Sequence, residues 1–128
     1  MKIIFTLLMA AFTSLANAIE KTSFPMELLG KWSPELVNCA ADFSYFDPTS
    51  GYSATRNMVI TEKRIQFWES SGNLVSIIKS GDNYVANLEM FEEDLSWIEN
   101  QTFVLSNEGS KLSRVSKGFE SNYYRCKK

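Results

Sequence analysis

Tyr84-Val85-Ala86-Asn87-Leu88-Glu89-Met90 is the stretch that decides the fold, because its even-numbered positions are all apolar. A period of two is that of a β-strand with one buried face. The turn formers Ser80-Gly81-Asp82 precede this stretch, and the apolar run 74–78 precedes the turn. The two runs therefore predict an antiparallel hairpin.

The same alternation of short apolar runs and turns extends outward from this hairpin. Seven strands are expected, over residues 56–61, 64–68, 74–78, 84–90, 97–105, 112–115 and 121–126. From residue 55 onward no helical periodicity exceeds two turns. We therefore expect a mainly β fold, an antiparallel up-and-down meander that closes into a small barrel and so hides its edges.

The residues before this meander read as turns and a loop. Residues 24–29 predict a short helical turn, with Pro25 in its first turn and Gly30 as its stop. Residues 33–36 predict a second turn, with Ser33 as N-cap and Pro34 at the first helical position. Residues 40–54 are rich in turn formers and predict a long loop.

The N-terminus has the layout of a secretory signal peptide. Met1-Lys2 supplies a positive charge, residues 3–12 are almost entirely apolar, and Ala16-Asn17-Ala18 supplies small residues for a signal peptidase. The apolar run is shorter than the roughly 20 residues that span a bilayer. We expect cleavage after Ala18, export to a bacterial periplasm, and one domain over residues 19–128.

The charge of the expected mature chain argues against a nucleic-acid partner. Removing Lys2 from the 13 basic and 15 acidic side chains leaves a net charge of −3, whereas nucleic-acid binders carry a basic face. Residues 80–110 hold seven acids and no base, and residues 111–128 hold six bases and one acid. Either strands of opposite charge support each other across the sheet, or the acids form a face for a cationic partner.

Cys39 and Cys126 are the two cysteines of the chain. In an exported protein such a pair is expected to form a disulfide. A reactive thiol or a pair of metal ligands is the alternative, but the chain has no histidine, and two thiols alone do not complete a zinc site. We expect the disulfide, and neither metal nor cofactor.

The lack of histidine also excludes Ser-His-Asp and Cys-His nucleophiles, and no phosphate-binding glycine loop occurs. Carboxylates are the remaining acid–base groups. The turn 92–94 is acidic and is expected to be solvated. Glu89 and Glu99 would face each other if Phe91 paired with Trp97, and a facing pair could raise one pKa or bind calcium. We expect a protein without enzymatic activity.

Gly30-Lys31-Trp32, placed after a helical turn and at the start of a β meander, resembles the motif of lipocalin-like (calycin) barrels. With Cys39 and Cys126 added, the chain also resembles small exported bacterial proteins of that shape. The resemblance implies that Trp32 plugs the closed end and that Arg125 packs over its ring, although Trp32 could equally be a plain core residue. Pro34 interrupts the long first strand of that family, and its T-D-Y motif is absent.

Four aromatic side chains in the predicted loop 40–54 are the candidates for ligand contact: Phe43, Tyr45, Phe46 and Tyr52. The resemblance implies that the first long loop lies over the mouth of the barrel, next to a ligand. The alternative is that these side chains pack near the disulfide.

These observations lead to three hypotheses. The first is a non-enzymatic periplasmic binding protein for a small apolar or amphipathic ligand at the open end of the barrel. The second is a protein-directed inhibitor or immunity-type factor that acts on a cationic envelope hydrolase through the acidic segment. The third is an accessory component of an envelope assembly.

Overall fold

The structure, a computed structural model, describes residues 19–41, 43–49 and 51–127, without the side chains of residues 44–47, 52 and 53. The expected signal peptide, residues 1–18, lies outside the described residues. No helix within the described ranges has the length and apolar character needed to cross a bilayer.

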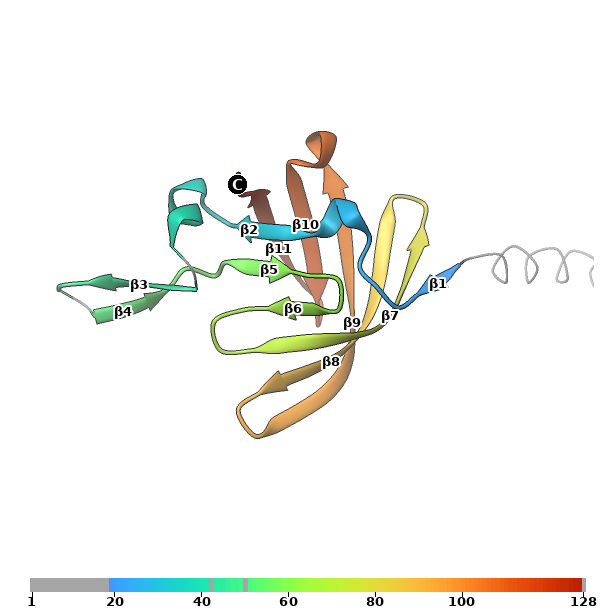
Figure 1. The fold of residues 1–128 in the computed structure, drawn as a ribbon, viewed down its shortest axis with the longest axis horizontal. Helices are drawn as coiled ribbons and strands as arrows, with labels where there is room; N and C mark the ends of the chain where they lie inside the picture. The colour runs from blue at the N-terminus through green and yellow to red at the C-terminus, as the bar shows by residue number, and fades with distance from the viewer. Residues whose placement is uncertain (1–18, 42, 50, 128) are drawn as a thin grey trace, which may run out of the picture.

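Eight of the described strands close into one antiparallel barrel (Figure 1). In order around the wall they are β2 (Gly30–Ser33), β5 (Met58–Ile60), β6 (Arg64–Gln66), β7 (Ser71–Ser80), β8 (Asn83–Glu92), β9 (Leu95–Ser106), β10 (Lys111–Ser116) and β11 (Phe119–Arg125), which pairs with β2 again. The short strand β1 (Glu20–Lys21) pairs with β7 beyond the end of β6. The predicted antiparallel meander and its closure into a barrel are confirmed, and each of the seven predicted runs overlaps a different strand of the barrel.

The barrel interior is packed with apolar side chains. Tyr84, Ala86, Leu88 and Met90 are all buried, so β8 has the alternation that its sequence predicts. Fully buried residues from other segments fill the remaining volume: Leu28, Trp32, Met58, Ile60, Ile65, Phe103 and Leu112. At Gly72 an added Cβ would lie 2.5 Å from the Met90 sulfur, so any other residue at this position of β7 would require Met90 to move.

The predicted N-terminal turn is present in a shorter form, as the 3₁₀-helix η1 (Met26–Leu28) with Pro25 before it. The second predicted turn is misplaced, since η2 spans Leu36–Ala40. Ser33 is still the last residue of β2, opposite Tyr124, and its Oγ accepts the Glu35 N–H at 3.2 Å. A third 3₁₀-helix, η3 (Asn107–Gly109), connects β9 to β10.

The prediction of a loop over residues 40–54 is wrong. The segment folds into strands β3 (Ser44–Asp47) and β4 (Gly51–Ala54), which pair as a separate two-stranded sheet. Aromatic residues favour extended pairing, and the turn formers between them connect the two strands. The hairpin projects from the side of the barrel (Figure 1).

Candidate functional site

One end of the barrel is closed around Trp32. Its indole is fully buried, and its Nε1 donates a hydrogen bond to the Leu28 carbonyl of η1 at 3.0 Å. The Arg125 guanidinium carbon lies 4.2 Å from the centroid of the Trp32 ring. The same guanidinium donates to the carbonyls of Leu29 and Gly109, each at 2.9 Å, and to that of Glu27. Arg125 therefore joins η1, η3 and the tryptophan into one closed end.

The other two residues of the Gly30-Lys31-Trp32 motif also have defined positions. Gly30 has a φ of +128°, and an added Cβ there would lie 3.5 Å from Arg125 Nη1. Lys31 points the other way, and its Nζ donates to the carbonyls of Cys39 and Ala41. Gly30 thus leaves room for Arg125, and Lys31 holds the segment that carries the disulfide.

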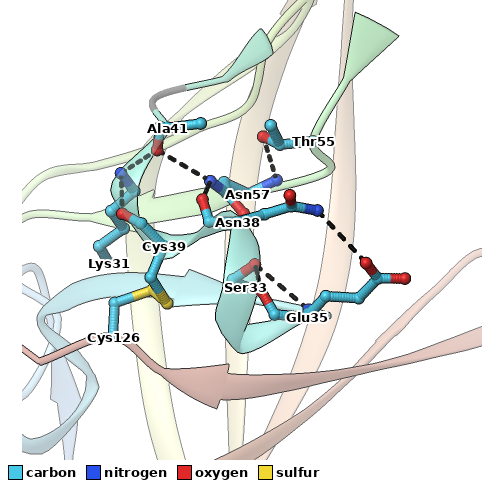
Figure 2. Close-up of a disulfide and its surroundings, with 9 residues drawn as sticks. All are labelled: Lys31, Ser33, Glu35, Asn38, Cys39, Ala41, Thr55, Asn57 and Cys126. Carbon is cyan, nitrogen blue, oxygen red and sulfur yellow. Dashed lines mark hydrogen bonds between the residues drawn. A yellow bond between two sulfur atoms is a disulfide. The ribbon is translucent and has the colours of Figure 1, made fainter. Parts of the chain in front are cut away.

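Cys39 and Cys126 form the predicted disulfide, with their Cα atoms 5.5 Å apart. Figure 2 shows that Lys31 and Asn57 converge on the Ala41 carbonyl beside this bridge. The Asn57 amide also donates to the Asn38 carbonyl at 2.9 Å. The bridge, η2 and the segment before β5 are therefore one hydrogen-bonded unit.

The interior becomes polar toward the end of the barrel opposite η1 and η3. Arg114 lies in register between Phe103 and Ser121, and Ser116 lies between Gln101 and Phe119. These positions follow the inward-facing Leu112 by two and four residues, so they share its face of β10. The open end consequently carries charged and hydroxyl side chains above an apolar core.

A hydrogen-bonded network links these polar side chains. Arg114 Nε donates to Gln101 Oε1 at 2.7 Å, and the Arg114 guanidinium carbon lies 4.5 Å from the Phe67 ring centroid. Glu99 accepts hydrogen bonds from Trp97 Nε1 at 2.7 Å and from Ser116 Oγ at 2.6 Å. Gln101, which is completely buried, lies between these two clusters on β9.

Glu99 stays ionised despite its partial burial. Burial alone would raise the pKa of this carboxyl. Hydrogen bonds from Ser116, Trp97 and Gln101, together with the positive charge of Lys117, outweigh that effect and lower the pKa below its usual value. The Lys117 ammonium itself lies 4.6 Å from the Trp97 ring centroid. A carboxylate held in this way is an acceptor rather than a proton donor near neutral pH.

A cleft of about 350 Å³ opens beside this network. Aromatic side chains form part of its wall, namely Phe67, Trp68 and Tyr123, and the rest is polar or small: Ala54, Arg56, Glu69, Ser70, Arg114 and Ser121. A second cleft, of about 230 Å³, lies on the other side of the loop 67–70 toward Phe91 and Glu93. The loop 67–70 is therefore the common wall of two hollows at the open end.

Comparison of the chain with protein-family models, with curated proteins and with solved structures finds no match in any of the three. The closed eight-stranded antiparallel barrel is compatible with a lipocalin-like fold.

The aromatic candidates of the hairpin are only partly described. Phe43 is half-buried, and its carbonyl accepts the Thr55 N–H at 3.0 Å. The side chains of Tyr45, Phe46 and Tyr52 lie outside the described residues. Ala54, the last residue of β4, lines the larger cleft, so the base of the hairpin adjoins the open end.

The pairing of Phe91 with Trp97 that would bring Glu89 and Glu99 face to face does not occur. Trp97 pairs with Met90 rather than with Phe91, which places Glu99 opposite Leu88 and Glu89 opposite Ile98. Glu99 consequently faces the interior and Glu89 the exterior. Among the described residues no group of three His, Cys, Asp or Glu side chains is arranged to hold a metal ion.

Sequence reasoning missed Arg114 and Gln101 as site residues, although the alternation of residues along their strands places both inside the barrel. Leu112 and Phe103 face the core, and every second residue from them shares that face. Extending this alternation outward would have placed Arg114, Ser116 and Gln101 inside the barrel, where a polar side chain requires a partner.

Proposed function

We propose that this chain is an exported, non-enzymatic binding protein that holds a small amphipathic molecule in the cleft at the open end of the barrel. The observation that carries the proposal is the pairing of aromatic and polar walls in one cleft of about 350 Å³. Small-molecule sites are typically hollows of roughly 300–1,000 Å³ with apolar walls and a few convergent polar groups.

The packed interior determines where such a ligand would lie. Trp32, Phe103 and Leu112 fill the barrel below the open end. A ligand would therefore sit across the mouth, with its apolar part on Phe67 and Trp68, rather than deep inside. This favours a compact ligand over a long chain. The shape of the barrel and the Arg125–Trp32 contact support the lipocalin-like assignment that accompanies this function.

We expect the neutral fluorophore N-phenyl-1-naphthylamine to bind the mature protein, and the Trp68→Ala variant to bind it about tenfold more weakly. Trp68 is 43% exposed and lines both clefts, so its loss removes contact area at the site. Fluorescence titration measures both affinities.

The matched control is Tyr124→Ala, which removes a similarly exposed aromatic side chain, 38% exposed, that lines neither cleft beside Trp68. Its affinity should equal that of the wild type. A Tyr45→Ala/Phe46→Ala variant, titrated in parallel, reports whether the β3–β4 hairpin contributes. Lack of probe binding by the wild type, or equal affinity of Trp68→Ala, contradicts the proposal.

A second candidate function, the inhibitor or immunity-type factor, is favoured by the tip of the β8–β9 hairpin. Glu92, Glu93 and Asp94 are exposed there. Leu95 and Ile98 beside them are 67% and 62% exposed. Apolar side chains next to acids would suit a cationic protein surface. Because Glu99 faces inward, it contributes nothing to this surface.

The variant that carries Glu92→Lys, Glu93→Lys and Asp94→Lys tests this second function. If a purified cationic cell-wall hydrolase is the partner, its binding by the wild type should weaken steeply with added salt, and the variant should not bind it. Glu62→Lys, an exposed acid outside this hairpin, is the control. Retention of binding by the triple variant would exclude the acidic tip as the contact.

A further inference from the structure

Arg114 is held at the cleft with part of its hydrogen-bonding capacity unused. Its Nε is committed to Gln101, and its guanidinium plane lies over the Phe67 ring. Within the described part of the chain, neither Nη nitrogen donates a hydrogen bond, and neither is fully buried. The paired N–H donors on that edge match the two oxygens of an oxyanion.

Glu99, the interior acid of this network, accepts its hydrogen bonds from side chains other than Arg114. Glu99 accepts from Trp97 and Ser116, and it lies near Lys117. Arg114 donates its hydrogen bond to Gln101 rather than to Glu99. No carboxylate of the described residues hydrogen-bonds to Arg114, so its positive charge is available to a ligand.

A second guanidinium belongs to the same cleft. Arg56 lines it and has a left-handed backbone, with a φ of +60°. Its neighbours Thr55 and Asn57 are both buried, and Asn57 is tied to η2. A non-glycine residue in this conformation is strained and persists where its surroundings impose it. The cleft thus has two arginines, and Glu69 is the one acid among its described lining residues.

We infer that the ligand is an organic anion, an oxyanion group joined to an apolar body, with the oxyanion held by Arg114 and Arg56 and the body against Phe67 and Trp68. The hydroxyls of Ser70 and Ser121 lie in the same lining and can complete the hydrogen bonding of the anion. Carboxylate, sulfonate and phosphate groups share this chemistry. The inference rests on the proposed function and adds the charge of the ligand to it.

Two fluorophores with the same ring system test the inference. N-phenyl-1-naphthylamine is neutral, and 8-anilinonaphthalene-1-sulfonate adds an anionic group to it. Arg114→Gln should weaken binding of the sulfonate about tenfold or more and change binding of the neutral probe less than twofold. The affinity of the wild type for the sulfonate should also fall with added salt, and that of the variant should fall less.

Arg56→Gln is the second variant, because an exposed side chain can be changed there without altering the core. It should weaken sulfonate binding about threefold and leave the neutral probe unaffected. Arg64→Gln, an exposed arginine that does not line the cleft, should change neither affinity.

Equal losses for the two probes in Arg114→Gln, or an unchanged sulfonate affinity in both cleft variants, overturn the inference while the proposed function stands. Failure of the wild type to bind the neutral probe overturns the proposed function itself. The two failures are therefore distinguishable within one set of titrations.

Discussion

Replacing Arg125 by methionine should lower the free energy of unfolding by about 3 kcal/mol. The methionine keeps much of the stem that packs beside Trp32 and removes every donor of the guanidinium. It eliminates a cation–π contact worth about 0.5–2 kcal/mol and charge-assisted hydrogen bonds worth about 1.5–3 kcal/mol each. Three backbone carbonyls, those of Glu27, Leu29 and Gly109, lose their Arg125 donors at once. Urea unfolding followed by circular dichroism measures the change.

Two further variants separate the parts of this effect. Arg64→Met removes an exposed arginine and should change the stability by less than about 0.5 kcal/mol. A double-mutant cycle with Trp32→Phe should give a coupling of about 1 kcal/mol between Arg125 and the indole. A loss in Arg125→Met no larger than that in Arg64→Met would mean that the closed end is held by apolar packing alone.

The barrel was predictable because the alternation of apolar and polar residues within a strand identifies its buried face. The alternation in β8 and the turn at residues 80–82 require no knowledge of distant contacts. The disulfide was predictable from the number of cysteines and the expected compartment. The hairpin of β3 and β4 is not predicted, because abundant turn formers indicate a loop, whereas here they connect two short aromatic strands.

The register of β8 and β9 could not be read from the sequence. The pairing of Glu92 with Leu95 leaves a two-residue turn, and Glu93 adopts a φ of +52° within it. Neither turn residue is glycine or asparagine, which are the usual signals of such a turn. A pairing offset by one residue moves every side chain to the other face, so the register that pairs Phe91 with Trp97 would place Glu99 opposite Glu89, whereas the observed register places it opposite Leu88.

The candidate site was missed for a related reason. A charged residue on a strand is ordinarily read as solvent-facing, and Arg114 follows Ser113 in a short polar run. Alternation from the buried Leu112 would give its face, but only the closed barrel shows that Gln101 and Phe67 are its partners. These contacts join residues far apart in the sequence, so composition and local periodicity carry no trace of them.

Opening the disulfide should cause the largest loss of stability. The bridge closes a loop of 88 residues, from a sequence separation of 87. The chain-entropy relation gives about 4.6 kcal/mol for such a loop as an upper value. We expect the Cys39→Ser/Cys126→Ser variant to lose about 3–4 kcal/mol in urea unfolding, and the reduced wild type to behave alike. A loss below about 1 kcal/mol in both would show that η2 is held in place without the bridge.

Opening the bridge should also lower the affinity of the cleft for the anionic probe, because hydrogen bonds connect the bridge through η2 to the segment that carries Arg56. Cys39 anchors η2, and Asn57 donates to the carbonyls of Asn38 in η2 and of Ala41 just after it (Figure 2). Asn57 follows Arg56 directly in the sequence. Lys31→Met removes the other donor to the Ala41 carbonyl and the donor to the Cys39 carbonyl but keeps the bridge, and it should have a smaller effect in the same direction. If the reduced protein remains folded and its affinity for the anionic probe falls while that for the neutral probe does not, the disulfide stabilises the barrel and also positions a binding group. Equal affinities before and after reduction would confine the bridge to stability, because Arg56 would then be held by β5 and the hairpin alone.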